Sequence, residues 1–180
     1  MSRLPLLSEN PSDPDVKAMF AEVLAKWPHV PNLYRILGNS PPMLRAWLDL
    51  AWPLRMNAKT PRRVRELMIL RGARISGTGY EWAHHVPLGR TAGITSEEID
   101  ALMEGRRVDS FSEAENAALR LAEEITTGPA ASEACMDALR PHFDDGEIVE
   151  LVLTAGFYVC VGRVLTSLQV PLEDKYEAPW

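Results

Sequence analysis

The sequence predicts an all-helical protein. Apolar residues recur at intervals of three and four along most of the chain, and no segment alternates apolar and polar residues as a half-buried strand does. Proline and glycine interrupt these segments at short intervals, and Ser, Thr or Asp precedes several of them as a helix cap. The periodicity, the breaks and the caps together predict about seven or eight helices joined by short turns.

Three helical segments are predicted before residue 53. The first is expected to begin at Ser12 or Asp13, with Pro14 in its first turn, and to run to Trp27. A second, short segment covers residues 33–37 and stops at a Gly-Asn pair. A pair of prolines then opens a third helix, whose aromatic stripe we expect in the core and which carries Leu44, Trp47, Leu48 and Leu50.

The middle of the chain predicts a helix-turn-helix. Thr60 is expected to cap a helix that has Pro61 in its first turn and ends at Gly77. The next helix should span Gly79 to Gly93. Pro87 lies inside it, and because a proline removes one backbone hydrogen bond, we expect a bend there.

Two capping boxes predict the helices that follow. Thr95 with Glu98, and Ser112 with Glu115, have the spacing at which the two side chains cap each other's backbone, so these glutamates need no catalytic explanation. A last long helix is expected to begin near Asp144 or Asp145 and to extend toward Leu168.

Composition narrows the class of protein. A length of 180 residues with 46% hydrophobic residues suits one domain with a substantial core. The net charge of −6, without a long basic run, argues against nucleic acid or an anionic membrane as partner. The longest apolar stretch, residues 148–161, is interrupted by Glu150 and predicts a buried helix. The N-terminus has no export signal, so we expect a cytoplasmic protein.

Cysteine and histidine usage predicts neither a disulfide nor a metal site. Cys135 and Cys160 are far apart, and each is expected to be a small buried hydrophobe in a reducing compartment. His84 and His85 are adjacent and diverge on a helix, and no second cluster of His and Cys completes a site. We therefore expect no metal and no other cofactor.

The densest group of ionisable residues lies at the start of the helix predicted from Gly79 to Gly93. Glu81 and His85 are four residues apart, so the carboxylate can orient the imidazole and raise its basicity; an ordinary surface pair has the same spacing. Tyr80 and His84 are also four apart but point about 100° away. Only one of the two histidines can therefore face the same cavity as Glu81.

The segment from Pro61 to Ile99, with its Arg65-Glu66 pair and its Thr-Gly-Tyr-Glu-Trp-Ala-His-His run from Thr78 to His85, resembles the carboxymuconolactone decarboxylase and alkylhydroperoxidase D (AhpD) superfamily. The resemblance extends from about Leu33 to Leu172. It implies an AhpD-like helical bundle, a single domain over residues 1–180 with its core at 33–172, and a role in the degradation of aromatic compounds. It also implies a homo-oligomer, a dimer, trimer or hexamer, which five tryptophans in so small a protein support.

The resemblance also assigns the positions of a site. In the AhpD branch a Glu precedes a Cys-x-x-Cys pair by one helix, and a His follows the second Cys by four residues; here these positions are Glu66, Thr78, Glu81 and His85. Thr78 and Glu81 supply neither a nucleophilic nor a resolving thiol, which peroxide reduction in that branch needs. The chain therefore looks closer to the decarboxylase branch, which also lacks the cysteine pair.

The favoured hypothesis is a cofactor-independent lyase or isomerase that acts on a small carbonyl or lactone compound. His85, Glu81 and Glu66 are the expected catalytic residues, because an enolate-like intermediate needs a proton donor and a polar environment. The expected substrate contacts are Tyr80, Thr78, Arg74 and His84, and Arg71 and Arg163 are further candidate cations.

Two other functions stay open. The chain could be a peroxidase-like oxidoreductase in which Cys160 replaces the missing thiol pair, although fold membership does not confer that activity. It could also be a non-catalytic oligomeric binding protein, with Glu66, Glu81 and His85 as a structural polar network.

Overall fold

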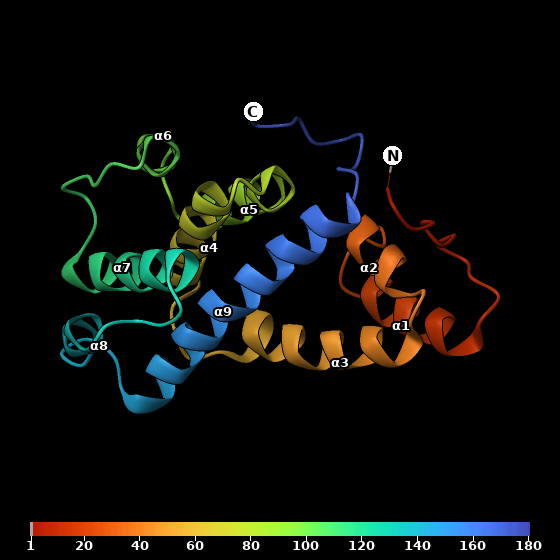
Figure 1. Ribbon diagram of the computed structural model, residues 1–180, viewed down its shortest axis with the longest axis horizontal. Coiled ribbons are helices and arrows are strands. Elements are labelled where there is room, and N and C mark those ends of the chain that lie inside the picture. The colour runs from red at the N-terminus through yellow and green to blue at the C-terminus, as the bar shows by residue number, and fades with distance from the viewer. Residues whose placement is uncertain (1) are drawn as a thin grey trace. The chain divides into compact units, whose positions relative to one another are not determined.

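The computed structural model describes residues 2–180, and Met1 lies outside the described residues. Within this range the chain forms nine α-helices and one π-helix and no strand, so the all-helical prediction is confirmed (Figure 1). The elements, in order, are α1 (Pro14–Leu24), α2 (Asn32–Leu37), α3 (Pro41–Trp52), η1 (Pro53–Asn57), α4 (Arg62–Ser76), α5 (Gly79–Thr91), α6 (Ser96–Glu104), α7 (Glu113–Thr127), α8 (Glu133–Leu139) and α9 (Asp145–Leu168). The count exceeds the predicted seven or eight. The additional helix is α8, seven residues long and capped by Ser132, which was not predicted.

The helices group into two compact units. The first comprises Met1–Asn57 with Leu165–Tyr176, and the second comprises Ala58–Val164 with Glu177–Trp180. Most of α9 therefore belongs to the second unit and its last turn to the first. The single domain over residues 1–180 stays a prediction.

The first unit holds α1 to α3 around its own core. Asp13 caps α1 as predicted, because its carboxylate accepts hydrogen bonds from two first-turn amides. The helix ends at Leu24 rather than Trp27, since the following turn mixes three- and four-residue hydrogen bonds before Pro28. On α3, Leu44 and Leu48 are fully buried and Trp47 is half-buried. Leu50 is exposed, because it lies about 200° around the helix from Leu48.

The second unit is built around α4. This helix packs against α5, α6 and α7, and Figure 1 shows it beside α5 and α7. One side chain cluster joins α4 to α7, α8 and the start of α9, through residues such as Met68, Leu121 and Leu151. A second cluster joins α4 to α5 and α6 through Leu67 and Trp82 among others. Helix α4 is therefore packed on two sides, by these two clusters.

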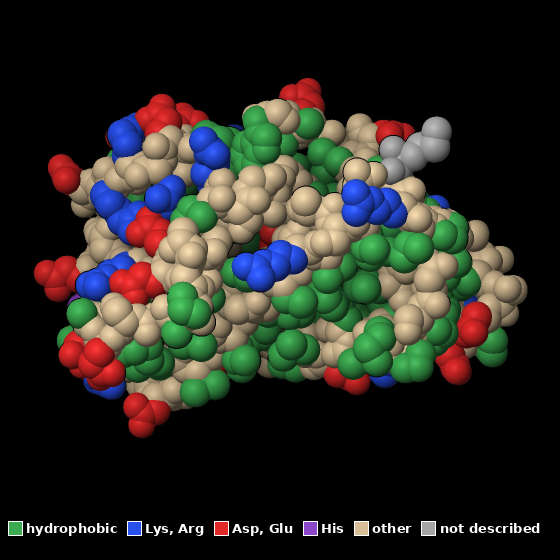
Figure 2. Space-filling view, in the orientation of Figure 1, with side chains coloured by type: hydrophobic (Ala, Val, Ile, Leu, Met, Phe, Trp, Pro, Cys, Tyr) green, Lys and Arg blue, Asp and Glu red, His purple; other side chains and the backbone are tan. Residues whose placement is uncertain are grey.

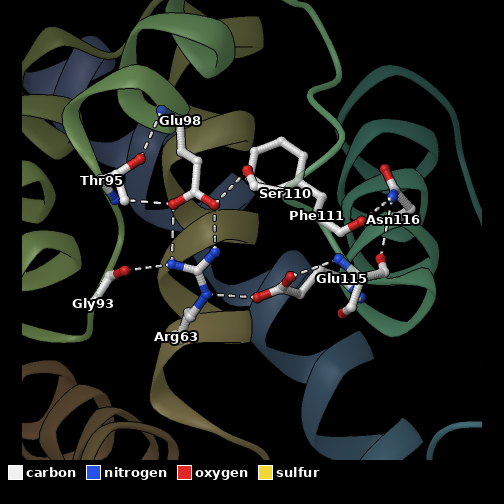
Figure 3. A network of polar contacts seen from close by, with 9 residues as sticks. Arg63, Gly93, Thr95, Glu98, Ser110, Phe111, Glu115 and Asn116 are labelled. Carbon is white, nitrogen blue, oxygen red and sulfur yellow. Dashed lines mark hydrogen bonds and ion pairs between the residues drawn. The ribbon is translucent and has the colours of Figure 1, made fainter.

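Ion pairs tie the second unit together at one end of α4. Arg63 binds both oxygens of Glu98, at 2.7 and 3.0 Å, and donates to Glu115 at 2.6 Å and to the Gly93 carbonyl at 2.5 Å (Figure 3). Both glutamates also complete the predicted capping boxes, which are confirmed. Charged side chains of both signs gather over α6 and α7 in Figure 2.

The start of α4 differs from the prediction. Pro61 holds the cap position, and Thr60 makes no side-chain cap; its backbone amide instead donates to Glu150 at 2.9 Å. The Thr60 amide thus finds its acceptor in a distant helix, on the Glu150 carboxylate of α9. Helix α5 continues through Pro87, and the expected bend there stays a prediction.

Helix α9 is apolar on nearly every face but only partly buried. It is long and apolar enough to cross a membrane by length and composition, yet half of its most apolar window is buried, and core helices pass the same test. Val149, Leu153 and Cys160 follow one exposed face. The predicted burial is confirmed for Cys135 and wrong for Cys160, which lies on that exposed side. The cytoplasmic location stays a prediction.

Candidate active site at the α4, α5 and α9 helices

A tight turn at Gly77 connects α4 to α5 and positions the first residues of the site. Gly77 ends α4 in the left-handed conformation, with φ of 68°, which a residue with a side chain rarely adopts. The Thr78 amide then donates to the Ala73 carbonyl, and α5 begins at the next residue. The turn folds α5 back against α4, so that polar residues of the two helices can meet.

Three polar side chains share the buried face of α5. Thr78, Glu81 and His85 stand at intervals of three and four, which is the spacing of one helix face, and they are 4%, 3% and 6% exposed. The sequence prediction that Glu81 and His85 share a face agrees with this spacing. The surface-pair alternative is excluded for these two residues, because both are buried.

The hydrogen bond that orients His85 comes from α4. His85 Nδ1 lies 2.7 Å from Glu66 Oε2, and the Glu66 side chain is fully buried. The other oxygen of Glu66 forms an ion pair with Arg62, one turn earlier on α4. The orienting carboxylate is therefore Glu66, whereas the helix spacing had favoured Glu81. A partly exposed guanidinium, a buried carboxylate and a buried imidazole are thus linked in a row.

The charges around Glu66 keep it ionised. Burial raises the pKa of this carboxyl, but the neighbouring His85 and Arg62 outweigh the burial and lower the pKa below its usual value. Because an ionised carboxylate only accepts hydrogen bonds, Nδ1 of His85 carries the proton in this contact. A change in the protonation of His85 that keeps this hydrogen bond would therefore take place at Nε2.

Helix α9 supplies the opposite wall. Tyr158 meets the His85 ring edge-on, with ring centroids 5.0 Å apart. Gly162, one turn later, faces the other two residues of α5: a Cβ at this position would lie 2.8 Å from both Glu81 Oε2 and Thr78 Oγ1. Tyr158, Gly162 and Arg62 were not among the predicted site residues. The i,i+4 spacing of Arg62 to Glu66 was the one available signal.

The other predicted substrate contacts are engaged elsewhere. The Tyr80 and His84 rings stack on each other, 4.3 Å apart, on a half-buried face of α5, so His85 is the histidine of the buried site. Arg74 is exposed, donates to the Met103 carbonyl and lies over Trp180.

The two further candidate cations do not join His85 either. Arg71 pairs with Glu123 at 2.7 Å, and Arg163 is exposed. The cation at the site is instead Arg62, with Arg65 buried next to Glu66 in sequence. Burial, followed by repulsion from Arg62, lowers the pKa of Arg65.

Neither thiol replaces the missing cysteine pair. Cys135 is buried in the core, and its burial raises the pKa of the thiol. Cys160 lies two residues from both Tyr158 and Gly162, which places it about 200° around α9 from each of them. It therefore faces away from His85. Within residues 2–180, His, Cys, Asp and Glu side chains form no group of three that could hold a metal ion.

A small cavity lies next to the site, between α4, α7 and α9. Its free volume of about 10 Å³ is close to the minimum that holds one water molecule. Met68, Ala122 and Thr154 are among its lining residues. The cavity is therefore too small for a substrate.

Gly162 gives a test of this packing. Gly162→Ala is expected to lower the free energy of unfolding by about 1–3 kcal/mol, because the new methyl group collides with Thr78 and Glu81. Gly156→Ala is the matched control: this glycine is on the same helix with nothing near its Cβ position, so alanine should raise stability by up to about 1 kcal/mol. Urea unfolding of both variants measures the difference, and two variants of equal stability would contradict the described contact.

The fold and site define a class of protein, an all-helical bundle with a buried Glu-His pair. Residues 41–124 match the model of the Carboxymuconolactone decarboxylase family. This matched segment is a little less than half of the chain, and it supports the resemblance to the carboxymuconolactone decarboxylase and AhpD superfamily. The uncharacterised protein YdfG of Bacillus subtilis (strain 168) is 32% identical over 94 residues, which cover 51% of this chain and 64% of YdfG. The chain thus spans less than two thirds of that relative's length.

Solved structures share the fold. A peroxidase-related protein with an alkylhydroperoxidase AhpD core from Ralstonia eutropha JMP134 has a TM-score of 0.84 at 20% identity, over 97% of this chain and 93% of its own. A peroxidase-related protein from Silicibacter sp. TM1040 has a TM-score of 0.80 at 19% identity, with the same coverage. The debrominase Bmp8, bound to 2,3,4-tribromopyrrole, has a TM-score of 0.76 at 18% identity, over 89% of this chain and 87% of its own. These likenesses establish the AhpD-like fold.

Proposed function

We propose that this protein is a cofactor-independent lyase or isomerase that transfers a proton on a small carbonyl or lactone compound. The observation that carries the proposal is the buried Glu66–His85 hydrogen bond of 2.7 Å, with Arg62 on the other carboxylate oxygen. A buried, oriented imidazole with a fixed tautomer is what general acid-base catalysis needs. The superfamily includes enzymes, and the debrominase shares the fold.

The pair supports a simple proton cycle. In a decarboxylation, the carbon–carbon bond to the carboxylate breaks, carbon dioxide leaves, and the electron pair stays on the substrate as an enolate. His85 in its imidazolium form then gives the Nε2 proton to the carbanion carbon and takes a proton back from solvent. In an isomerisation the same nitrogen removes the proton from one carbon and returns it to another. Glu66 stabilises the imidazolium in both cases.

The revised site changes the role proposed for Glu81. Its carboxylate is buried beside Thr78 and Gly162, so it contributes to the polar wall of the site while Glu66 orients the imidazole. An anionic substrate is attracted by Arg62, whose side chain is one third exposed.

A homo-oligomer remains part of the proposal. Trp27, Trp47 and Trp52 are half-buried and Trp180 is exposed, so aromatic surface is available for a second copy.

The proposal predicts turnover that needs no thiol. Small lactone and 3-oxo carboxylates are incubated with the protein in deuterated water, and NMR follows carbon dioxide release and deuterium incorporation at carbon. We expect both signals without added thiol, and the same rates for Cys160→Ser, because Cys160 faces away from His85. In parallel, hydroperoxide consumption with a dithiol reductant is measured. Peroxide turnover that Cys160→Ser abolishes, in a protein that exchanges no carbon-bound proton, would favour the oxidoreductase alternative.

A further inference from the structure

The outer face of α9 exposes a narrow, mostly apolar stripe. Within residues 149–163 the exposed positions are Val149, Leu153, Gly156, Cys160 and Arg163, and every other residue of this segment is buried or half-buried. Val149 is 57% exposed and Leu153 is 45% exposed, although both are large apolar side chains. We call these five residues the α9 stripe. Figure 2 shows hydrophobic side chains on the side of α9 that faces the viewer.

The spacing of the α9 stripe is that of a helix-helix contact. Its residues follow one another at intervals of four, three, four and three, which is the spacing at which one helix presents a straight seam to a second helix. The exposed positions of α6 show what a water-facing helix carries instead, because all four are polar: Ser96, Glu97, Asp100 and Glu104. The α9 stripe is therefore suited to cover by another helix.

The charges of α9 make the stripe complementary to a reversed copy of itself. The first turn of the helix is acidic, with Asp145 and Glu147, and Arg163 near the other end is the one cationic residue in its sequence. Two parallel copies would place like charges side by side at both ends. In an antiparallel pair each Arg163 lies toward the acidic end of the other helix, and the two helix dipoles oppose each other favourably.

Gly156 marks the centre of the stripe and leaves space there. It is the middle one of the five exposed residues, and no atom lies within 4 Å of the position that its Cβ would take. A two-fold axis at Gly156 brings the glycines of two copies face to face, so the helix backbones can approach closely. The same axis places Leu153 of each copy beside the partner's Cys160, and Arg163 level with the partner's Val149.

We propose that the α9 stripe is the surface at which two copies of this chain pair, with their α9 helices antiparallel and the two-fold axis at Gly156. The pairing removes the apolar surface of Val149 and Leu153 from water, which drives the association. The inference names the contact for the homo-oligomer that the proposed function includes, and it is independent of the proposed proton transfer.

A lipid surface suits the stripe less well. Half of the most apolar window of α9 is buried inside the protein, so only one narrow face could meet a bilayer. The net charge of −6 also opposes approach to anionic head groups. A second copy, by contrast, matches the stripe in both shape and charge.

The first test compares two leucines by sedimentation velocity of the full chain at micromolar concentration. We expect Leu153→Lys to raise the dissociation constant of the pair about a hundredfold, because a symmetric contact contains the lysine twice and each copy costs about tenfold. Leu88→Lys on α5 is the matched control: this leucine is 39% exposed and lies outside the stripe, so the dissociation constant should stay unchanged. Circular dichroism checks that both variants remain helical.

The second test uses cysteines to determine the orientation. In the antiparallel pair the two Cys160 Cα atoms are about 12 Å apart along the helix axis, whereas a disulfide needs Cα atoms within about 7 Å. Oxidation should therefore leave the unmodified protein without an intermolecular disulfide. Gly156→Cys in a Cys160→Ser protein places the two thiols on the axis, and non-reducing electrophoresis should show a covalent dimer.

Several results would overturn the inference. These are a monomer at micromolar concentration, equal effects of Leu153→Lys and Leu88→Lys, and a disulfide between two native Cys160 residues, which would indicate a parallel pair. Sedimentation of a monomer together with phosphatidylcholine vesicles would assign the stripe to lipid instead. Pairing that Leu153→Lys weakens, in a protein that shows no deuterium incorporation at carbon, would preserve the inference while removing the proposed catalysis.

Discussion

Replacing His85 by Gln is expected to lower turnover at least about a hundredfold while the helices stay formed. Glutamine cannot exchange a proton, but its amide can still donate to the Glu66 oxygen that now lies 2.7 Å from Nδ1. The buried carboxylate therefore keeps a donor as well as its ion pair with Arg62. Circular dichroism and the deuterium-exchange assay measure the two effects on the same preparation.

Two further variants make this result specific. Glu66→Gln removes the charge that favours the imidazolium, so it should also reduce turnover and change its pH profile, more strongly than Glu81→Gln does. His142→Gln, in the exposed turn before α9, controls for general effects of losing a histidine and should be fully active. A His85→Gln protein with full activity, or one that unfolds, would favour the structural polar network over the proposed chemistry.

His85→Gln should also change how the free energy of unfolding depends on pH below neutrality. The folded-state pKa of Glu66 is lowered, so its contribution to stability is complete above the pKa of an unfolded glutamate, about 4.3, and is lost as the pH falls below that value. Without the imidazolium in His85→Gln, burial is opposed by Arg62 alone, and the Glu66 pKa rises. The variant should therefore lose less stability between pH 7 and pH 3 than the unmodified protein does.

Replacing Arg63 by Met should cost about 3–5 kcal/mol of unfolding free energy, the largest stability effect we expect in the second unit. The side chains of Glu98 and Glu115 are 3% and 11% exposed, so removal of the guanidinium leaves two poorly hydrated carboxylates close together (Figure 3). Arg106→Met is the control, because its ion pair with Glu104 is more than half exposed and should contribute little. Equal losses in the two variants, measured by urea unfolding at pH 7, would contradict this.

Acid titration gives an independent measure of the Arg63 network. Burial alone would raise the Glu98 pKa, but Arg63, the Thr95 amide and Ser110 together lower it to about 2. Because the folded pKa is below the unfolded value, this stabilisation of about 3 kcal/mol is present above pH 5 and is lost as the pH falls toward 2. In Arg63→Met the stability should depend much less on pH over this interval.

Local sequence rules succeeded where the interaction itself was local. Both capping boxes were predicted because the two partners are three residues apart and the helix backbone alone sets their distance. The capping prediction failed for Thr60, whose side chain caps no helix and whose amide donates to Glu150, 90 residues later. The exposure of Cys160 could not be predicted either, because the sequence of an apolar helix does not show which of its faces is exposed to solvent.

The site was predicted in its residues but not in its connections. The family resemblance brought Glu66, Glu81 and His85 together, while helix spacing favoured Glu81 as the partner of the imidazole. The structure shows the bond to Glu66, because α4 and α5 fold back on each other at Gly77. Arg74 was a candidate cation from its position in the motif, but its guanidinium reaches Met103 and Trp180 instead.

The sequence alone determined the helical class, the family resemblance, the two capping boxes and the lack of a thiol pair at positions 78 and 81, since periodicity, cap chemistry and residue type are properties of the chain itself. Tertiary structure decided which residues of different helices meet: Glu66 of α4 with His85 of α5, and Tyr158 and Gly162 of α9 with α5. The reason is geometric. A salt bridge or a ring contact depends on side-chain positions within a few ångströms, and for residues on different helices those positions are set by packing rather than by spacing along the chain.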